Sequence, residues 1–442
     1  MDYFLYLLVN ANLFLRPAEV VPDLERLPLY LWFILACLLV SVPKLMSLVS
    51  AEAPLRHPVC MCVLGVFGFV ALSHLAQSDL DRTAAEVFEF FKVVVYFVLF
   101  LALVSTPGKL RVLLACVILF GVISTGVAVL EYHDVIELPN LKTVQDSWLD
   151  ERTGDLQVVR RLMLTGILHD PNEFCLFLSM LTLLTLHQLS NPQSGIARLF
   201  WLAPLGLFTY GINLTKSRGG LLALLAGLAT LAICQWGWRR TAAVGVLLLP
   251  LVAFGLAGRQ TSISVSEGTG RARLELWSDW LLKFRESPLL GESPKIAPPE
   301  VEEDKALRWN YQQIAHNSYL QGFADLGFIG GMLFLGAFFF AFRAMLQYRG
   351  DQVTVLDPQQ RHLYPFLFGA LATYMTGMMS LSLCYVLPTY FVLALPVVFT
   401  RLTATEPRLE PVRFDAIAWR NLAMSSVGML GFIYVFMKVF RV

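Results

Sequence analysis

His316 and Asn317 lie near the end of a long polar stretch, just before an apolar run with a glycine-rich segment at 327–331. An imidazole titrates near neutral pH, so a histidine can accept a proton from a hydroxyl group or donate a hydrogen bond to an anion. Ionisable groups at the edge of a membrane span are costly and often functional. This pair is therefore the first candidate for chemistry on a substrate held at a membrane surface.

A second candidate lies upstream, where Arg218 stands at the beginning of another apolar run. Gly219 and Gly220 follow it and let neighbouring backbone approach closely. A third segment, Arg273-Leu-Glu-Leu-Trp277, precedes Ser287-Pro-Leu-Leu-Gly291. Snorkelling to lipid headgroups is the ordinary role of an arginine at the end of a span, and it stays open for Arg218.

The composition requires a membrane protein around these residues. The chain has 442 residues, of which 56% are hydrophobic and 15% are charged, and its mean hydropathy is +0.62. We expect an all-α polytopic membrane bundle, a single integral membrane domain over 1–442, with roughly 12 or 13 transmembrane helices. Apart from a short first span at about 3–15 and a block at 363–400 that we split at Pro388, the apolar windows lie near 28–43, 58–78, 93–108, 112–130, 174–190, 199–214, 219–237, 241–257, 326–342 and 421–437.

The distribution of lysine and arginine predicts which loops face outward. With a cytoplasmic N-terminus, the short inner connections hold most of these cations. The two longer polar segments, 131–170 and 258–318, then lie on the outer side together with Arg218. Residues 271–286 carry Leu274, Trp277, Leu281 and Leu282 at helical spacing, which predicts an amphipathic helix near the bilayer surface.

Three motifs occur in a defined order along the chain: Arg218-x-x-x-Leu222, the arginine-tryptophan and proline-glycine segment, and His316-Asn317 followed by nine residues and Gly327-x-x-Gly330. Together they resemble the motifs of the bacterial O-antigen ligase and O-antigen polymerase family, membrane glycosyltransferases that use a lipid carrier. The resemblance covers roughly residues 160–345. It implies a helical fold like that of the glycosyltransferase C superfamily with a large periplasmic loop. It also implies a metal-independent, inverting reaction without a cofactor.

The resemblance implies a donor glycan on undecaprenyl pyrophosphate and an acceptor hydroxyl group. Arginine gives planar, permanently charged contacts to phosphate, so we assign the pyrophosphate to Arg218 and Arg273, with Arg271 beside them. His316 is either the general base or a hydrogen-bond donor to the pyrophosphate, and Asn317 adjoins it as a substrate ligand. An interfacial hydrogen-bonded histidine and an arginine on the wet face of a helix are the structural alternatives for His316 and Arg273.

The segment His169-Asp170-Pro171-Asn172-Glu173 admits two interpretations. Asp170 before Pro171 is typical of a helix start. Alternatively, Asn172 or Glu173 orients a sugar or the catalytic histidine, so Asn172 joins the candidate glycan-binding residues. Asp79 and Asp81 are a weak candidate for a metal pair, and we predict no metal site.

The function that we expect is glycan transfer on the periplasmic face of a bacterial inner membrane, in lipopolysaccharide or exopolysaccharide biosynthesis. The acceptor remains open between lipid A core for a ligase, a growing glycan for a repeat-unit polymerase, and a protein hydroxyl for an O-oligosaccharyltransferase. A polysaccharide transporter or flippase is the alternative from another class, and charges buried in mid-span would favour it. The net charge of +1 gives no indication of nucleic-acid binding.

Overall fold

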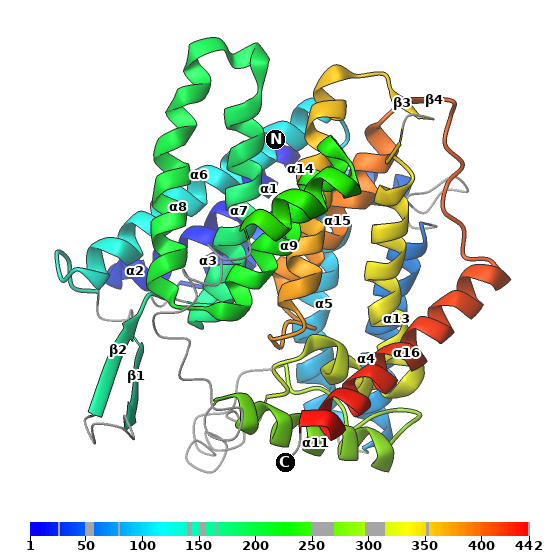
Figure 1. Ribbon diagram of the computed structural model, residues 1–442. Coiled ribbons are helices and arrows are strands. Elements are labelled where there is room, and N and C mark those ends of the chain that lie inside the picture. The colour runs from blue at the N-terminus through cyan, green and yellow to red at the C-terminus, as the bar shows by residue number, and fades with distance from the viewer. Residues whose placement is uncertain are drawn as a thin grey trace.

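The structure is a computed structural model that describes residues 1–24, 27–48, 57–77, 80–138, 144–149, 156–164, 166–248, 269–296, 314–350 and 353–440. Within them the protein is a bundle of helices with two short β-ribbons (Figure 1). The helices are α1 (Asp2–Leu15), α2 (Pro17–Val20), η1 (Pro22–Leu24), α3 (Leu29–Ser47), α4 (Pro58–Ala76), α5 (Leu80–Leu103), α6 (Pro107–Tyr132), η3 (Gly166–Leu168), α7 (Pro171–Ser190), η4 (Pro192–Trp201), α8 (Leu202–Thr215), α9 (Arg218–Trp236), α11 (Thr269–Glu286), α13 (Ser318–Leu346), α14 (Pro358–Gly377), α15 (Leu387–Leu402) and α16 (Ala416–Phe440). The strands are β1 (Val144–Leu149), β2 (Leu156–Arg161), β3 (Thr354–Val355) and β4 (Thr405–Glu406).

The predicted all-α membrane architecture is confirmed. Among the described residues, eight helical segments are long and apolar enough to cross a membrane: α3, α4, α6, α7, η4 with α8, α9, α13 and α16. Helices α1 and α15 are apolar but shorter, and α5 carries Glu86, Glu89 and Lys92. Glu89 and Lys92 form an ion pair within the helix, at 2.6 Å.

Several helices begin where a capping side chain precedes a proline. Thr106 before Pro107 and Asp357 before Pro358 each accept a backbone N–H of the first turn. Proline lacks the N–H that has no partner at a helix start, so it fits the first position without loss. These signals fix the beginnings of α6 and α14 and make their boundaries readable from the sequence.

Helix α13 changes direction at Gly327, whose φ of 69° lies in the left-handed region. Residues 287–293, which we call the clamp, hold the backbone on both sides of this kink. The N–H of Phe328 donates to Pro288 O at 2.8 Å, and the N–H groups of Glu292 and Ser293 donate to Ala324 O and Asp325 O, each at 3.0 Å. The clamp thereby satisfies backbone groups that the kink releases from the helical ladder.

The glycines of two sequence motifs meet in this clamp. A Cβ on Gly327 would overlap the backbone of Leu289, and a Cβ on Gly291, whose φ is 73°, would overlap the backbone of Asp325. Gly330 likewise leaves room for Leu326 and Phe69. Gly291 and Gly327 are therefore required because two backbones approach closely there.

Helix α11 occurs at the predicted amphipathic segment and packs against α13 and α16. Figure 1 shows it at the end of the bundle opposite to strands β3 and β4. Trp277 and Leu281 contact a small buried cluster that includes Leu320. Leu282 was expected on the same face, but it is half-exposed, because a residue five positions after Trp277 points well away from it.

Candidate functional site

Helix α11 places Arg273 next to His316. The indole Nε1 of Trp277 donates to Ala315 O at 3.0 Å and so fixes α11 against the segment just before His316. Arg273 lies four residues before Trp277, on the same face of the helix. Charge interactions link Arg273 and His316 directly. The arginine-tryptophan motif and the histidine motif therefore lie close together in the fold.

His316 adopts a left-handed backbone conformation with a φ of 45°. Few residues other than glycine do so, and such conformations gather at functional sites. The backbone N–H of His316 donates to Ser382 Oγ at 3.0 Å, which ties this conformation to the loop between α14 and α15. Helix α13 begins two residues later, at Ser318.

The same loop braces the beginning of α13. The Ser318 hydroxyl donates to Leu381 O at 2.6 Å and accepts from the N–H of Leu383 at 2.8 Å. Asn317 is the N-cap, and its Oδ1 accepts from the N–H groups of Tyr319 and Leu320, both at 3.1 Å. Asn317 Nδ2 is buried and has no hydrogen-bond partner among the described residues. The oxygen of this amide is thus structural, whereas its N–H₂ group is not engaged by the described residues.

Arg218 is the first residue of α9 and is exposed. The preceding Ser217 caps the helix by accepting the N–H of Gly220 at 3.2 Å. A Cβ on Gly219 would approach Ser380 Oγ to 2.6 Å, so α9 begins directly against the loop that holds His316. The loop between α14 and α15 is therefore common to the arginine motif and the histidine motif.

Arg161, at the end of β2, extends this site. Its Nη2 donates to Asn172 Oδ1 and its Nε donates to Thr215 O, each at 2.9 Å. Its charge interacts with that of Arg273. Neighbouring residues of a strand point to opposite faces, so Arg160 points away and pairs with Asp134 at 2.7 Å.

Asp170 supplies a negative charge beside these cations. It caps α7 by accepting from the N–H groups of Asn172 at 2.7 Å and Glu173 at 3.2 Å, with Pro171 at the first position. The helix-start interpretation of this segment is confirmed. The carboxylate also interacts with the charges of Arg273 and His316. Asn172 directs its oxygen to Arg161 and thereby orients an arginine.

Burial controls protonation in this site. Burial lowers the pKa of His316, and the nearby charge of Arg273 lowers this pKa further, whereas Asp170 raises it. Burial also lowers the pKa of Arg273, which nevertheless remains protonated. At neutral pH the site therefore contains a neutral imidazole, able to accept a proton, beside at least two guanidinium cations.

Some predicted residues lie outside these contacts. Arg271 is within α11, but its side chain is not among the described parts of the chain, and the same holds for Asp81; Asp79 lies outside the described residues altogether. The described residues contain no group of three or more His, Cys, Asp or Glu arranged to hold a metal ion. Metal independence remains a prediction, because only an activity measurement tests it.

Comparison with known families adds to the interpretation of this group of residues. Residues 203–335 match the family model described as O-antigen ligase. The resemblance to the O-antigen ligase and polymerase family is confirmed. A search of curated proteins gives no match. The matched segment contains Arg218, Arg273 and His316. The structure places the beginnings of α9 and α13 against the loop between α14 and α15, and it packs α11 against α13.

Arg161 and Asp170 lie before the O-antigen ligase segment, and the sequence analysis did not assign them to the site. One signal was present: Arg160 and Arg161 are adjacent in a segment that forms a strand, so only one of them can face a given site. Two structural facts were missing. These are the β1–β2 hairpin and the position of Thr215 O at the end of α8, against which Arg161 rests.

Proposed function

We propose that the protein transfers a glycan from undecaprenyl pyrophosphate to an acceptor hydroxyl group at the periplasmic face of the inner membrane. The proposal refines the ligase-like glycan transfer in polysaccharide biosynthesis that the family match supports. One observation carries it: Trp277 fixes α11 against the residue before His316, so that the charge of Arg273 interacts with those of Arg161, Asp170 and His316. A pyrophosphate needs cations, and an attacking hydroxyl group needs a base.

The arginines are suited to a diphosphate. Arg161 and Arg273 repel one another in the absence of a bound anion, and partial burial of Arg273 increases the cost of that repulsion. A pyrophosphate between them would remove this cost and accept charge-assisted hydrogen bonds from both guanidinium groups. Arg218, at the beginning of α9, would provide a third cation from the other side of the α14–α15 loop. Arg271, two residues before Arg273, stays a candidate for the same phosphates on the sequence alone.

His316 would act as general base. The acceptor hydroxyl oxygen attacks the anomeric carbon, and its proton passes to the neutral imidazole. The bond between the anomeric carbon and the pyrophosphate oxygen breaks, and its electron pair leaves with the pyrophosphate, whose charge the arginines stabilise. Attack from the face opposite to the leaving group inverts the anomeric centre. A hydrogen bond from His316 to the pyrophosphate is the alternative role.

The two asparagines would have different roles. Asn317 has an unpartnered buried Nδ2 next to His316, so it would donate to a hydroxyl or phosphate oxygen of the substrate. Asn172 accepts from Arg161, so it would act by orienting that guanidinium group and not by contacting the sugar. Its effect on the reaction should therefore depend on Arg161.

Complementation of a deletion strain tests this proposal. Accumulation of lipid-linked polymer without ligation would identify a ligase, whereas products carrying a single repeat unit would identify a polymerase. Arg161→Ala should fail to restore the product, and Arg160→Ala, which removes the neighbouring charge on the opposite face of β2, should restore it at equal expression. Normal product with Arg161→Ala would remove Arg161 from the proposed pyrophosphate site.

A further inference from the structure

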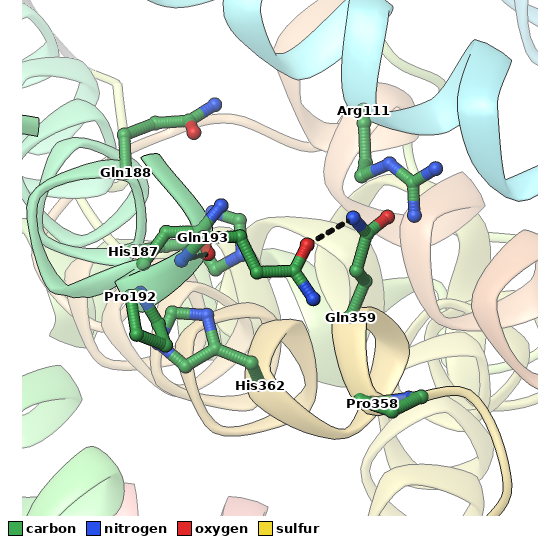
Figure 2. A pocket seen from close by; sticks show the side chains of 9 residues that line it. Arg111, His187, Gln188, Pro192, Gln193, Pro358, Gln359 and His362 are labelled. Atoms are coloured by element: carbon green, nitrogen blue, oxygen red, sulfur yellow. Dashed lines mark hydrogen bonds between the residues drawn. The ribbon is translucent and has the colours of Figure 1, made fainter. Parts of the chain in front are cut away.

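A pocket of about 240 Å³, bordered by several polar side chains, lies at the other end of α7 from the candidate site. Its lining residues come from α6, α7, η4 and α14, and Figure 2 shows their side chains. Helix α7 has 20 residues, so its two ends are separated by about 30 Å, the thickness of the hydrocarbon core of a bilayer. Asp170 caps one end, and His187 lies at the other.

Apart from Pro192 and Pro358, the lining side chains carry groups that can donate hydrogen bonds. Arg111 contributes a guanidinium group whose Nη1 is buried and has no hydrogen-bond partner among the described residues. The rings of His187 and His362 are 4.8 Å apart, and the Ser190 hydroxyl contacts His362 Nε2 at 3.1 Å. None of the nine lining residues is acidic. An unpaired guanidinium donor without a carboxylate is the arrangement that an anion would complete.

Two amides border the same space. Gln359 Nε2 donates to Gln193 Oε1, which links the first turn of α14 to η4 (Figure 2). The bond uses one donor of Gln359 and leaves the second N–H of that amide, and both N–H groups of Gln193, for other acceptors. The volume far exceeds the roughly 10–15 Å³ that one water requires, so a tetrahedral anion fits the space.

The surroundings of the pocket indicate a lipid as the carrier of this anion. Helix η4, which contributes Gln193, projects Ile196 and Phe200 outward with 85% and 74% of their surfaces exposed. Exposed apolar side chains on a short helix at the end of a membrane bundle are typical of a segment that lies in the lipid interface. The pocket therefore opens at the level of the headgroups in the leaflet opposite to the candidate site.

We propose that this pocket binds the phosphate group of an anionic phospholipid, with Arg111 and His362 as its principal ligands and η4 beside the acyl chains. Phosphate is the headgroup part that guanidinium and imidazole donors recognise. Inorganic phosphate carries the same group and could also bind, so the experiment compares the phospholipid with inorganic phosphate. The site is separate from glycan transfer and does not rest on the function proposed above.

The test measures the thermal unfolding temperature of the full chain in neutral detergent, titrated with phosphatidylglycerol, phosphatidylcholine or inorganic phosphate. Phosphatidylglycerol should raise this temperature in a saturable manner, and phosphatidylcholine should raise it less, because its headgroup has no net negative charge. Arg111→Ala should weaken the apparent affinity for phosphatidylglycerol by about 10-fold or more, since a charge-assisted hydrogen bond is lost.

Arg198→Ala is the matched control, because Arg198 is an exposed cation of η4 that does not line the pocket. It should leave the affinity within about twofold. If Arg111→Ala unfolds, His362→Ala provides the same comparison. Stabilisation by phosphatidylglycerol that is equal in the wild type and in both pocket variants would overturn the proposal. If only inorganic phosphate raised the unfolding temperature in an Arg111-dependent manner, the ligand would not be a phospholipid.

Discussion

His316 offers the sharpest test of the candidate site, because its backbone and its side chain can be perturbed separately. A left-handed φ of 45° is unfavourable for alanine by roughly 1–2 kcal/mol, whereas asparagine adopts this conformation several times more readily. His316→Asn therefore keeps the turn and removes the titratable base. His316→Ala removes both, and His316→Gln keeps a neutral hydrogen-bond donor.

If His316 is the general base, all three variants should lose on the order of 10²- to 10⁴-fold in transfer rate. This loss corresponds to roughly 2.7–5.4 kcal/mol in activation free energy, which exceeds the backbone strain that separates alanine from asparagine. Donor binding should persist in each variant, because arginines make the proposed contacts to the pyrophosphate. If His316 instead donates a hydrogen bond to the pyrophosphate, donor affinity should fall in His316→Ala and recover partly in His316→Gln.

The pH dependence follows from the surroundings of His316. The neutral imidazole is the active form, so the rate is present above the pKa and is lost as the pH falls through it. Burial and Arg273 lower this pKa, so the decline should occur below the ordinary histidine value of about 6.5. Asp170 raises the pKa, so Asp170→Asn, which preserves the helix cap, should move the decline to still lower pH.

The assay is single-turnover transfer by purified protein with saturating lipid-linked donor, together with a separate measurement of donor binding. Equal rates in wild type and His316→Asn, at equal donor binding, would refute the general-base role and restore the interpretation of an interfacial histidine. A pH profile that does not respond to Asp170→Asn would show that the titrating group is not His316.

The remaining predictions concern the arginines, the clamp and the metal. Arg218→Ala and Arg273→Ala should each abolish transfer in a folded protein, and lysine should rescue Arg218 poorly because a point charge lacks the planar fork; near-normal product at equal expression would contradict this. Gly291→Ala should lower the unfolding temperature, with a destabilisation of roughly 1–3 kcal/mol, whereas Gly428→Ala, where the added methyl group meets open space, should change it little. Transfer should persist with a chelator present, and activity that disappears and returns with magnesium or manganese would refute metal independence.

Much of the bundle could be predicted, because long apolar windows in the sequence indicate membrane-spanning helices. The apolar windows at 58–78, 112–130 and 174–190 became α4, α6 and α7 with boundaries shifted by a few residues. The predicted apolar window at 326–342 starts later in the chain than helix α13, which begins at Ser318. Asp325 broke the apolar pattern there, yet it is buried and accepts a hydrogen bond from Tyr385 at 3.1 Å. A charge that finds a partner across the bundle cannot be recognised from its own segment.

The candidate residues of the site could be chosen from the sequence, but the contacts that hold them in place could not. The types and spacing of Arg218 and His316 are local properties, so the sequence shows them. Ser380 and Ser382 are ordinary serines in a polar connection, and only the fold places this connection between both motifs. Arg161 was missed for the same reason, because its importance depends on Asn172 and Thr215, which are distant in the chain.

The anchoring of α11 and the clamp has an evolutionary consequence. The N–H of Ile296, just after the clamp, donates to Glu86 on α5, and Ala315 is held by Trp277 on the other side of residues 297–314. Both ends of that stretch are therefore attached to the scaffold independently of what lies between them. Changes of sequence within this stretch would leave the anchors of Arg273 and His316 in place. Related chains could thus differ there and still keep the same arrangement of these two residues.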